Sequence, residues 1–225
     1  MRGYREQRTA SAPQTYVDTS PSRPLIDGLD YARDNHCLVV IEGHSGRGKS
    51  AGAKAWTEAN LHRARYITLS SPLNRSTFFG SVAAALGLEF AESLSSARLQ
   101  ARIESHLRQT KFMLVIDEAQ NVWPAGYKIN HDPELVEWIT NACCNQGIAV
   151  GLVATKGFSI QRARVEKQVR WNSEQLRRRV DEGQHIVLPD TPTVADLGAY
   201  AIHMAPEATA GMIKILVGDA LSCEG

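Results

Sequence analysis

The sequence lacks the features that mark membrane, secreted and disulfide-rich proteins. Its longest purely apolar runs, such as residues 37–41, are far shorter than the ~18–20 residues that a membrane-spanning helix needs. The chain opens without a charged segment followed by an apolar one, so we expect no secretion and no membrane partner. It has four cysteines and no Cys-x-x-Cys pair, which indicates reduced thiols in a cytoplasmic protein.

The composition also excludes a disordered or fibrous protein. Of 225 residues, 43% are hydrophobic and 22% are charged, which is typical of a globular chain. A chain of this length buries a substantial core without help from metals or disulfides. The histidines show no metal-binding spacing, so a zinc site is not expected. There is no internal repeat, and we expect one α/β body with a modest appendage.

A net charge of only +1 hides an uneven distribution of charge. Residues 156–179 hold eight basic side chains against two acidic ones, and residues 1–23 are also basic. The rest of the chain is therefore acidic. A basic segment of this kind fits a polyanionic partner such as nucleic acid, although a solvated helix face produces the same pattern.

The order of the periodic segments predicts an arm, a core and a lid. Residues 1–23 are rich in Arg, Ser, Thr and Pro and predict a flexible basic arm. Residues 24–190 alternate between strand-like and helical patterns, and residues 191–225 predict two small helices that form a lid. The expected strands are residues 37–42, 64–69, 112–116, 148–154 and 185–188. The expected helices are a short one after Pro24, residues 49–59, 77–86, 96–108 and 134–145, and basic helical segments across 159–181.

Five apolar strands separated by helices predict a parallel sheet that helices cover on both faces. Capping residues mark several of the helix starts. Ser76 is the expected N-cap of the helix that follows it, and Asp132 is that of the helix beginning at Glu134. Thr193 opens the first C-terminal helix, with Asp196 three residues further on.

The strongest motif is the segment from Gly43 to Ser50, which matches GxxxxGK[ST] at every required position. It follows an expected strand and opens an expected helix, the context that a phosphate-binding loop needs. Its glycines let backbone N–H groups converge on a phosphate, and the helix N-terminus favours negative charge. Lys49 is placed to reach the β- and γ-phosphates of ATP, and Ser50 to ligand Mg²⁺. The expected nucleotide-binding residues are Gly43, His44, Ser45, Gly46, Arg47, Gly48, Lys49, Ser50 and Ala51.

The alternative to a phosphate loop is a glycine-rich turn with an unrelated lysine. The strand and the helix expected on either side of the motif argue against it.

The expected strand over residues 112–116 runs directly into two carboxylates, Asp117 and Glu118. A parallel-sheet strand delivers them to the same edge of the sheet as the phosphate loop. Asp117 is expected to hold Mg²⁺ through water, and Glu118 to orient and deprotonate the attacking water. An acidic helix cap after a strand is the alternative interpretation. Two adjacent carboxylates at this distance beyond a phosphate loop favour the catalytic one.

These motifs together resemble those of the AAA+ ATPases. The resemblance consists of the phosphate loop, Asp-Glu-Ala-Gln at 117–120, and an expected strand that ends in Val-Ala-Thr-Lys-Gly at 153–157. Within the AAA+ ATPases, the sequence looks most like the transposon target-selection ATPases, the family of the phage Mu B protein. Leu-Ser-Ser-Pro-Leu-Asn at 69–74 and Glu-Gln-Leu-Arg-Arg-Arg-Val at 174–180 support this narrower match. The resemblance covers roughly residues 25–200.

This resemblance implies a fold and further site residues. The fold is an α/β P-loop NTPase (AAA+) three-layer α/β/α sandwich with a five-stranded parallel sheet and a short C-terminal helical lid. Thr155 matches the sensor position that helps to place the attacking water. Arg179 matches the arginine finger that reaches the γ-phosphate of a neighbouring subunit, with Arg178 as the second choice. The alternative for both arginines is solvation of a helix end. Only Lys214 is basic after Arg179, so the sequence departs from the family's pattern of an arginine in the lid.

The resemblance also implies a function with ATP and Mg²⁺ as cofactors. It implies an ATPase that oligomerises on duplex DNA as a ring or filament and selects or activates target DNA for a transposase. Two alternatives stay open: a helicase-loader or initiator-type AAA+ ATPase, and a nucleotide-switched protein-interaction module that binds no DNA. With no recognition-helix motif in the sequence, the expected DNA contacts are to phosphates. The candidates for these contacts are Arg75, Lys111, Lys156, Arg162 and Arg164.

Overall fold

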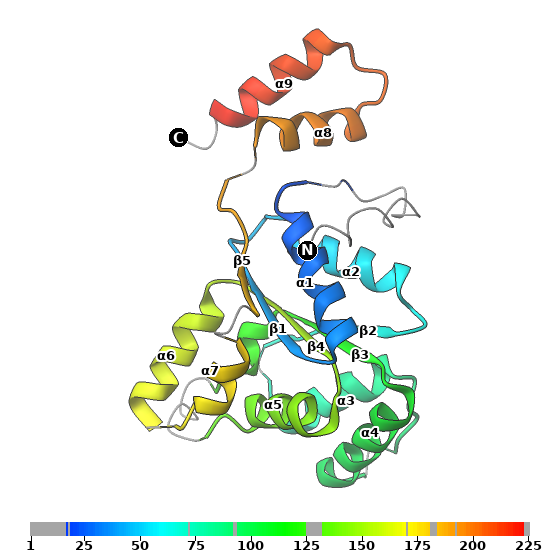
Figure 1. Ribbon diagram of the computed structural model, residues 1–225. Coiled ribbons are helices and arrows are strands. Elements are labelled where there is room, and N and C mark those ends of the chain that lie inside the picture. The colour runs from blue at the N-terminus through cyan, green and yellow to red at the C-terminus, as the bar shows by residue number, and fades with distance from the viewer. Residues whose placement is uncertain are drawn as a thin grey trace.

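A computed structural model gives the fold of the chain (Figure 1). It describes residues 17, 19–71, 73–91, 94–124, 132–169, 171–180, 184–191 and 193–222. Most of the arm expected over residues 1–23 lies outside these residues. The end of that segment is part of the fold, since Thr19 and Ser22 are buried and the first helix already begins at Ser22.

The centre of the molecule is a five-stranded parallel sheet, as the sequence predicts. The strand order is β2-β3-β4-β1-β5. Strand β1, which precedes the phosphate loop, therefore lies between β4 and β5, and β4 separates it from β3. The strands are β1 (Leu38–Glu42), β2 (Ala64–Thr68), β3 (Met113–Asp117), β4 (Val150–Ala154) and β5 (His185–Val187).

The helices agree with the expected ones in order, and the helix after the phosphate loop has the predicted bounds. The basic segment forms two separate helices, α6 and α7, and a 3-10 turn, η1, follows β3. The elements are α1 (Ser22–Asn35), α2 (Lys49–Ala59), α3 (Arg75–Ala85), α4 (Ser96–Thr110), η1 (Ala119–Val122), α5 (Glu134–Gln146), α6 (Gly157–Val169), α7 (Glu174–Val180), α8 (Val194–Met204) and α9 (Ala210–Ser222).

Two of the predicted N-caps are wrong. Helix α3 is capped by Asn74 and not by Ser76, because the Asn74 side chain accepts from the backbone N–H of Thr77 at 2.9 Å. The Thr77 hydroxyl accepts in return from the N–H of Asn74, which completes a capping box two residues earlier than expected. Helix α5 has Pro133 at its N-cap position, with no side-chain cap, in place of the expected Asp132.

The sheet is the middle of three layers, which confirms the predicted α/β/α sandwich. Alternate residues of a strand face opposite sides, so strands β1 to β4 each contribute to two hydrophobic clusters. Helices α1 and α2 cover one face, and helices α3 to α7 cover the other (Figure 1). Every residue of β1, β3 and β4 is buried, as expected for strands with helices on both faces.

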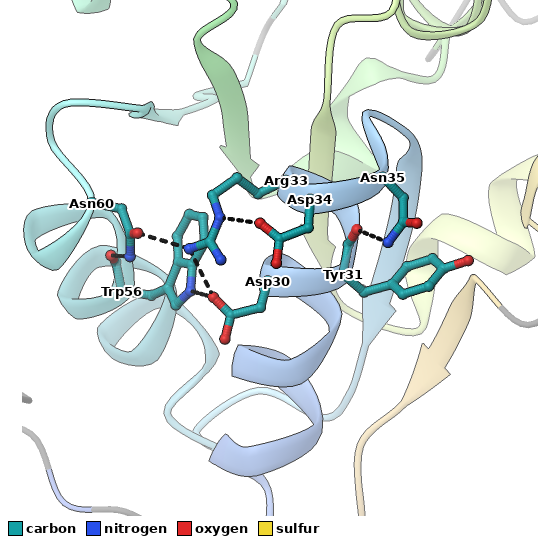
Figure 2. Close-up of polar contacts among 7 residues, drawn as sticks. All are labelled: Asp30, Tyr31, Arg33, Asp34, Asn35, Trp56 and Asn60. Atoms are coloured by element: carbon teal, nitrogen blue, oxygen red, sulfur yellow. Dashed lines mark hydrogen bonds and ion pairs between the residues drawn. The ribbon is translucent and has the colours of Figure 1, made fainter. Parts of the chain in front are cut away.

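A polar cluster fixes α1 against α2, the helix that follows the phosphate loop (Figure 2). The Arg33 guanidinium lies 3.0 Å from Asp30 and donates to Asp34 at 2.8 Å and to Asn60 at 2.9 Å. It also lies over the ring of Trp56, whose Nε1 donates to Asp30 at 2.9 Å. Because Trp56 and Asn60 come from the end of α2, the first helix is held against the phosphate-loop helix.

The segment expected to form the lid contains α8 and α9, which pack chiefly against each other. Thr193 and Asp196 form the expected capping box at the start of α8. Asp196 also accepts from the N–H of Ser20 at 2.6 Å and from the Ser20 hydroxyl, so the segment before α1 is tied to the lid. Burial alone would raise the pKa of Asp196, but the hydrogen bonds from Ser20 and Thr193 lower it to about 2.

None of the helices in the described part of the chain is long and apolar enough to cross a lipid bilayer.

Candidate nucleotide site

The phosphate loop connects β1 to α2 and has the backbone that its glycines predict. Gly46 and Gly48 adopt left-handed conformations, with φ of 79° and 71°. A residue with a Cβ would be strained at both positions, so the path of the loop depends on these two glycines. Helix α2 begins directly after Gly48, with Lys49 and Ser50 in its first turn.

The Lys49 side chain points into the loop. Its Nζ donates to the carbonyl oxygens of Gly43 at 2.9 Å and His44 at 2.6 Å, and the residue is 8% exposed. Burial lowers the pKa of the Lys49 ammonium, while the negative charges of Asp117 and Glu118 oppose this shift. The ammonium is therefore held between the loop and the two predicted catalytic carboxylates.

Asp117 ends β3 as a buried carboxylate with two partners. Its Oδ1 accepts from the backbone N–H of Glu118 at 2.9 Å, and its Oδ2 accepts from the Tyr66 hydroxyl at 2.5 Å. Burial and the contact with Asp117 raise the pKa of Tyr66 to about 12, and this hydroxyl also interacts with Thr68 and Ser50. Tyr66 thus donates to one of the two residues expected to hold Mg²⁺. Sequence analysis missed it, because only the pairing of β2 with β3 brings it to this place.

The predicted sensor residue Thr155 and the predicted base Glu118 are linked through Gln120. The Nε2 of Gln120 donates to Glu118 Oε2, and its Oε1 accepts from the backbone N–H of Thr155 at 3.1 Å. The Thr155 hydroxyl accepts in turn from the N–H of Gly157 at 3.3 Å. Sequence analysis recognised Gln120 only as part of a motif and gave it no role.

A second buried carboxylate, Glu42, lies at the end of β1 immediately before the phosphate loop. It accepts from the backbone N–H of Ser159 at 2.8 Å and from the Ser159 hydroxyl at 2.6 Å, and His185 Nε2 lies 2.6 Å away. Glu42 therefore joins β1 to the first turn of α6 and to β5. Burial alone would raise its pKa, but the hydrogen bonds from His185 and Ser159 outweigh burial and lower it.

Two residues that follow β5 in the chain, Asp190 and Tyr200, also lie at the phosphate loop. Asp190 lies 3.5 Å from His44 Nε2 and 3.0 Å from Lys156 Nζ. From the lid, the hydroxyl of Tyr200 lies 3.4 Å from the position that a Cβ on Gly48 would occupy. Lys156, an expected DNA contact, is thus engaged by a carboxylate beside the phosphate loop.

The remaining expected DNA contacts lie on different helices and do not form one cluster. Arg75, at the start of α3, donates to Gln100 at 2.6 Å and lies 3.5 Å from Glu134. Lys111 is the exposed C-cap of α4. On α6, Arg164 is exposed, and Arg162 lies 3.8 Å from Glu166. Figure 1 shows α4 and α6 well apart, and α6 is the helix that carries two of the expected contacts, Arg162 and Arg164.

Both candidate finger arginines lie on α7. Leu176 and Val180 anchor this helix on the face of the sheet opposite to α2. The Arg178 side chain is 73% exposed and pairs with Glu174 at 2.5 Å. The Arg179 side chain lies outside the described part of the structure. Arg178 is therefore an exposed side chain of a helix on the face of the sheet opposite to α2.

The residues at this edge of the sheet fit a magnesium-bound nucleotide by their chemistry. Ser50 and Asp117 offer a hydroxyl and a carboxylate, the hard oxygen ligands that Mg²⁺ prefers, and Tyr66 donates to Asp117. No group of three His, Cys, Asp or Glu side chains suited to a metal ion occurs among the described residues.

A family model described as "AAA domain" matches residues 32–161, which include the phosphate loop, both carboxylates and Thr155. The chain belongs to the AAA family of ATPases. This confirms the broader resemblance seen in the sequence and does not address the narrower one to the transposon ATPases. A search of curated proteins gives no match to the chain.

Several solved structures share this fold at low sequence identity. A Walker-type ATPase of Pyrococcus abyssi has a TM-score of 0.55 at 17% identity, with 94% of this chain and 69% of that chain covered. The replication initiator DnaA bound to AMPPCP and single-stranded DNA has a TM-score of 0.55 at 13% identity, with 91% and 58% covered. Cdc6p from Pyrobaculum aerophilum has a TM-score of 0.52 at 15% identity, with 90% and 53% covered. The chain thus spans little more than half of the DnaA and Cdc6p chains, and these similarities show the fold alone.

Glu42→Gln is expected to lower the free energy of unfolding by about 1–3 kcal/mol at neutral pH, because it replaces a buried, hydrogen-bonded carboxylate with a neutral amide. The folded-state pKa of Glu42 is lowered. The charge therefore stabilises the fold fully above the unfolded value of about 4.3, and this contribution is lost as the pH falls through the folded value. Urea denaturation should show a difference between wild type and variant that is constant above pH 5 and shrinks below about pH 4.

The control for this measurement is Glu89→Gln, a change at an exposed glutamate. It should leave stability within about 0.5 kcal/mol of wild type. A Glu42 variant whose stability deficit grows as the pH falls would contradict the assignment.

Proposed function

We propose that this chain is an ATP-dependent DNA-binding ATPase that assembles on duplex DNA and selects or activates target DNA for a transposase. The observation that carries the ATPase part is the convergence of Lys49, Asp117, Glu118 and Thr155 at one edge of the sheet. The basic surface of α6 and the sequence resemblance to the transposon target-selection ATPases support the DNA and transposase parts.

Each site residue has a distinct part in the proposed reaction. The loop N–H groups and Lys49 bind the phosphates, and Ser50 and Asp117 hold Mg²⁺, which would neutralise the charge that develops on the phosphates. Glu118 orients a water molecule and accepts its proton during attack on the γ-phosphate. Thr155 helps to place the same water from the tip of β4. An arginine of α7 from a neighbouring subunit completes the site.

Lys49→Ala should weaken ATP binding strongly, because it removes a charged group of the loop that is aimed at the phosphates. Glu118→Gln should preserve ATP binding and lower kcat by about 10²–10⁴-fold, since it keeps the shape but loses the base. Equilibrium binding of a fluorescent ATP analogue and steady-state phosphate release measure the two effects separately. Lys54→Ala, at an exposed lysine of the same helix, is the matched control.

The ATPase assignment fails if Lys49→Ala binds and hydrolyses ATP as wild type does. If only Glu118→Gln keeps wild-type turnover, another residue activates water.

The finger arginine should act between subunits. Arg179→Ala should leave nucleotide binding by the monomer nearly intact and reduce ATP-dependent assembly and hydrolysis, because a guanidinium donates to the γ-phosphate bound by the neighbour. A mixture of Arg179→Ala and Lys49→Ala can form an interface with an intact loop and an intact finger. Partial recovery of ATPase activity on mixing is the expected result.

No recovery despite demonstrated co-assembly would count against Arg179. Arg178→Ala, tested in the same mixture, then decides whether its neighbour serves as the finger.

Duplex DNA should be retained only when an ATP analogue is present, with little sequence preference. Its affinity should fall steeply between low and moderate salt, because phosphate contacts release counterions. The double variant Arg162→Ala/Arg164→Ala should weaken this binding at every sequence, whereas Arg63→Ala, at an exposed arginine before β2, should not. Filter binding across a salt series, with electron microscopy of the complexes, provides the measurement.

The second candidate function is a helicase loader or initiator, which the shared fold with DnaA and Cdc6p favours. Weak or absent duplex binding together with nucleotide-dependent binding to a replicative helicase would select it. A strict sequence requirement or affinity that does not change with salt would contradict the proposed phosphate-based DNA binding.

A further inference from the structure

Gln120 contacts two groups of the proposed hydrolytic site at once. It lies in η1, the 3-10 turn that directly follows the carboxylate pair on β3, and its side chain spans the gap between β3 and the tip of β4. One end of its amide meets the Glu118 carboxylate, and the other meets the backbone N–H of Thr155 at 3.1 Å. None of the roles assigned above accounts for these contacts.

The orientation of this amide is fixed by chemistry. The backbone N–H of Thr155 is only a donor, so the Gln120 oxygen must face it. The NH₂ group must then face Glu118, and it donates to Oε2. One carboxylate oxygen of Glu118 is thereby held by a neutral donor. The other oxygen, Oε1, is not bonded by Gln120 and is left to accept from water.

The backbone around Glu118 makes such a support necessary. Glu118 has φ of 55° and ψ of 37°, a left-handed conformation that costs a residue with a Cβ of order 1 kcal/mol or more. Its carbonyl oxygen accepts from the N–H of Asn121 at 2.9 Å, and the Asn121 side chain donates to the Leu69 carbonyl at 3.0 Å. These contacts fix the main chain of the turn, whereas Gln120 is the contact that fixes the Glu118 carboxylate.

We propose that Gln120 is a positioning residue for ATP hydrolysis, which holds the Glu118 carboxylate in place by donating to it while it is itself aligned by the Thr155 N–H. The proposal rests on the proposed ATPase function of the same site. Through this amide, the position of the base depends on the position of the β4 tip. Hydrolysis then requires the Glu118 carboxylate and the tip of β4 to be correctly placed relative to each other. Phosphate binding by the loop does not require this.

Two substitutions of Gln120 separate its two hydrogen bonds. Gln120→Leu removes both. Gln120→Glu keeps an oxygen that accepts from the Thr155 N–H but cannot donate to Glu118, and it places a second carboxylate against the first. Both variants should lower kcat by about 10- to 100-fold, because a displaced catalytic group loses its alignment with the reacting atoms. The Kd of a fluorescent non-hydrolysable ATP analogue should stay within about twofold, because the hydrogen bonds of Gln120 among the described residues go to Glu118 and Thr155 and not to the phosphate loop.

Amide hydrogen exchange gives a readout that does not depend on activity. Exchange at the Thr155 N–H should become faster in Gln120→Leu, which removes its acceptor, and remain protected in Gln120→Glu, which keeps one. The control is Asn121→Ala in the same turn, which loses a side-chain hydrogen bond of similar length without touching Glu118. It should lose clearly less kcat than Gln120→Leu, because the Glu118 carboxylate keeps its donor.

The interaction is also tested by combining variants. In a Glu118→Gln background the base is already gone, so adding Gln120→Leu should have almost no further effect on kcat. Wild-type turnover in Gln120→Glu, or an equal loss of kcat in Asn121→Ala and Gln120→Leu, would overturn the proposal. If Glu118→Gln is inactive while both Gln120 variants turn over like wild type, this inference alone fails. If the wild-type protein hydrolyses no ATP, the proposed function fails and this inference with it.

Discussion

The structure depends on the burial of a parallel sheet on both faces. Strands β1, β3 and β4 are buried along their whole length, so polar side chains are costly everywhere on them except at their ends. All five strands run in the same direction, and their carboxyl ends meet at one edge. Glu42, Asp117 and the residues after Ala154 are therefore brought together by the direction of the strands. The chemistry of the site is a consequence of where this sheet permits polar groups.

Those polar groups satisfy one another, and most of their partners come from distant parts of the chain. Tyr66 and Asp117 are 51 residues apart, Gln120 and Thr155 are 35 apart, and Glu42 and Ser159 are 117 apart. A buried carboxylate without a donor would cost several kcal/mol, so each pairing also fixes the relative position of two elements. The hydrogen bonds of the site thus stabilise the register of the strands as well as the catalytic geometry.

The difference between local patterns and partners that are distant in the chain explains which features sequence analysis found and which it missed. The phosphate loop, Asp117, Glu118 and the five strands follow from local patterns, in which a glycine, a helix start or an apolar run carries its own meaning. Tyr66, Gln120 and Glu42 carry no local signal, because their roles arise only when β2, β4, α6 and β5 are placed around them. The misassigned cap of α3 has a similar origin. Ser76 and Asn74 are both good caps in sequence, and only the reciprocal bonds with Thr77 select Asn74.

The hydrogen bonds of the site differ in whether they would have to change when a nucleotide binds. The proposed function requires the Lys49 ammonium to face the phosphates, so its hydrogen bonds to the Gly43 and His44 carbonyls would have to be exchanged for charge-assisted ones. The hydrogen bonds Tyr66–Asp117 and Gln120–Glu118 do not involve the Lys49 ammonium, so they need not break when a nucleotide binds. In the proposed reaction, nucleotide binding therefore reorganises the loop lysine while the groups proposed for hydrolysis stay aligned. Such preorganisation is what allows fixed dipoles and charges to stabilise a transition state without first being rearranged.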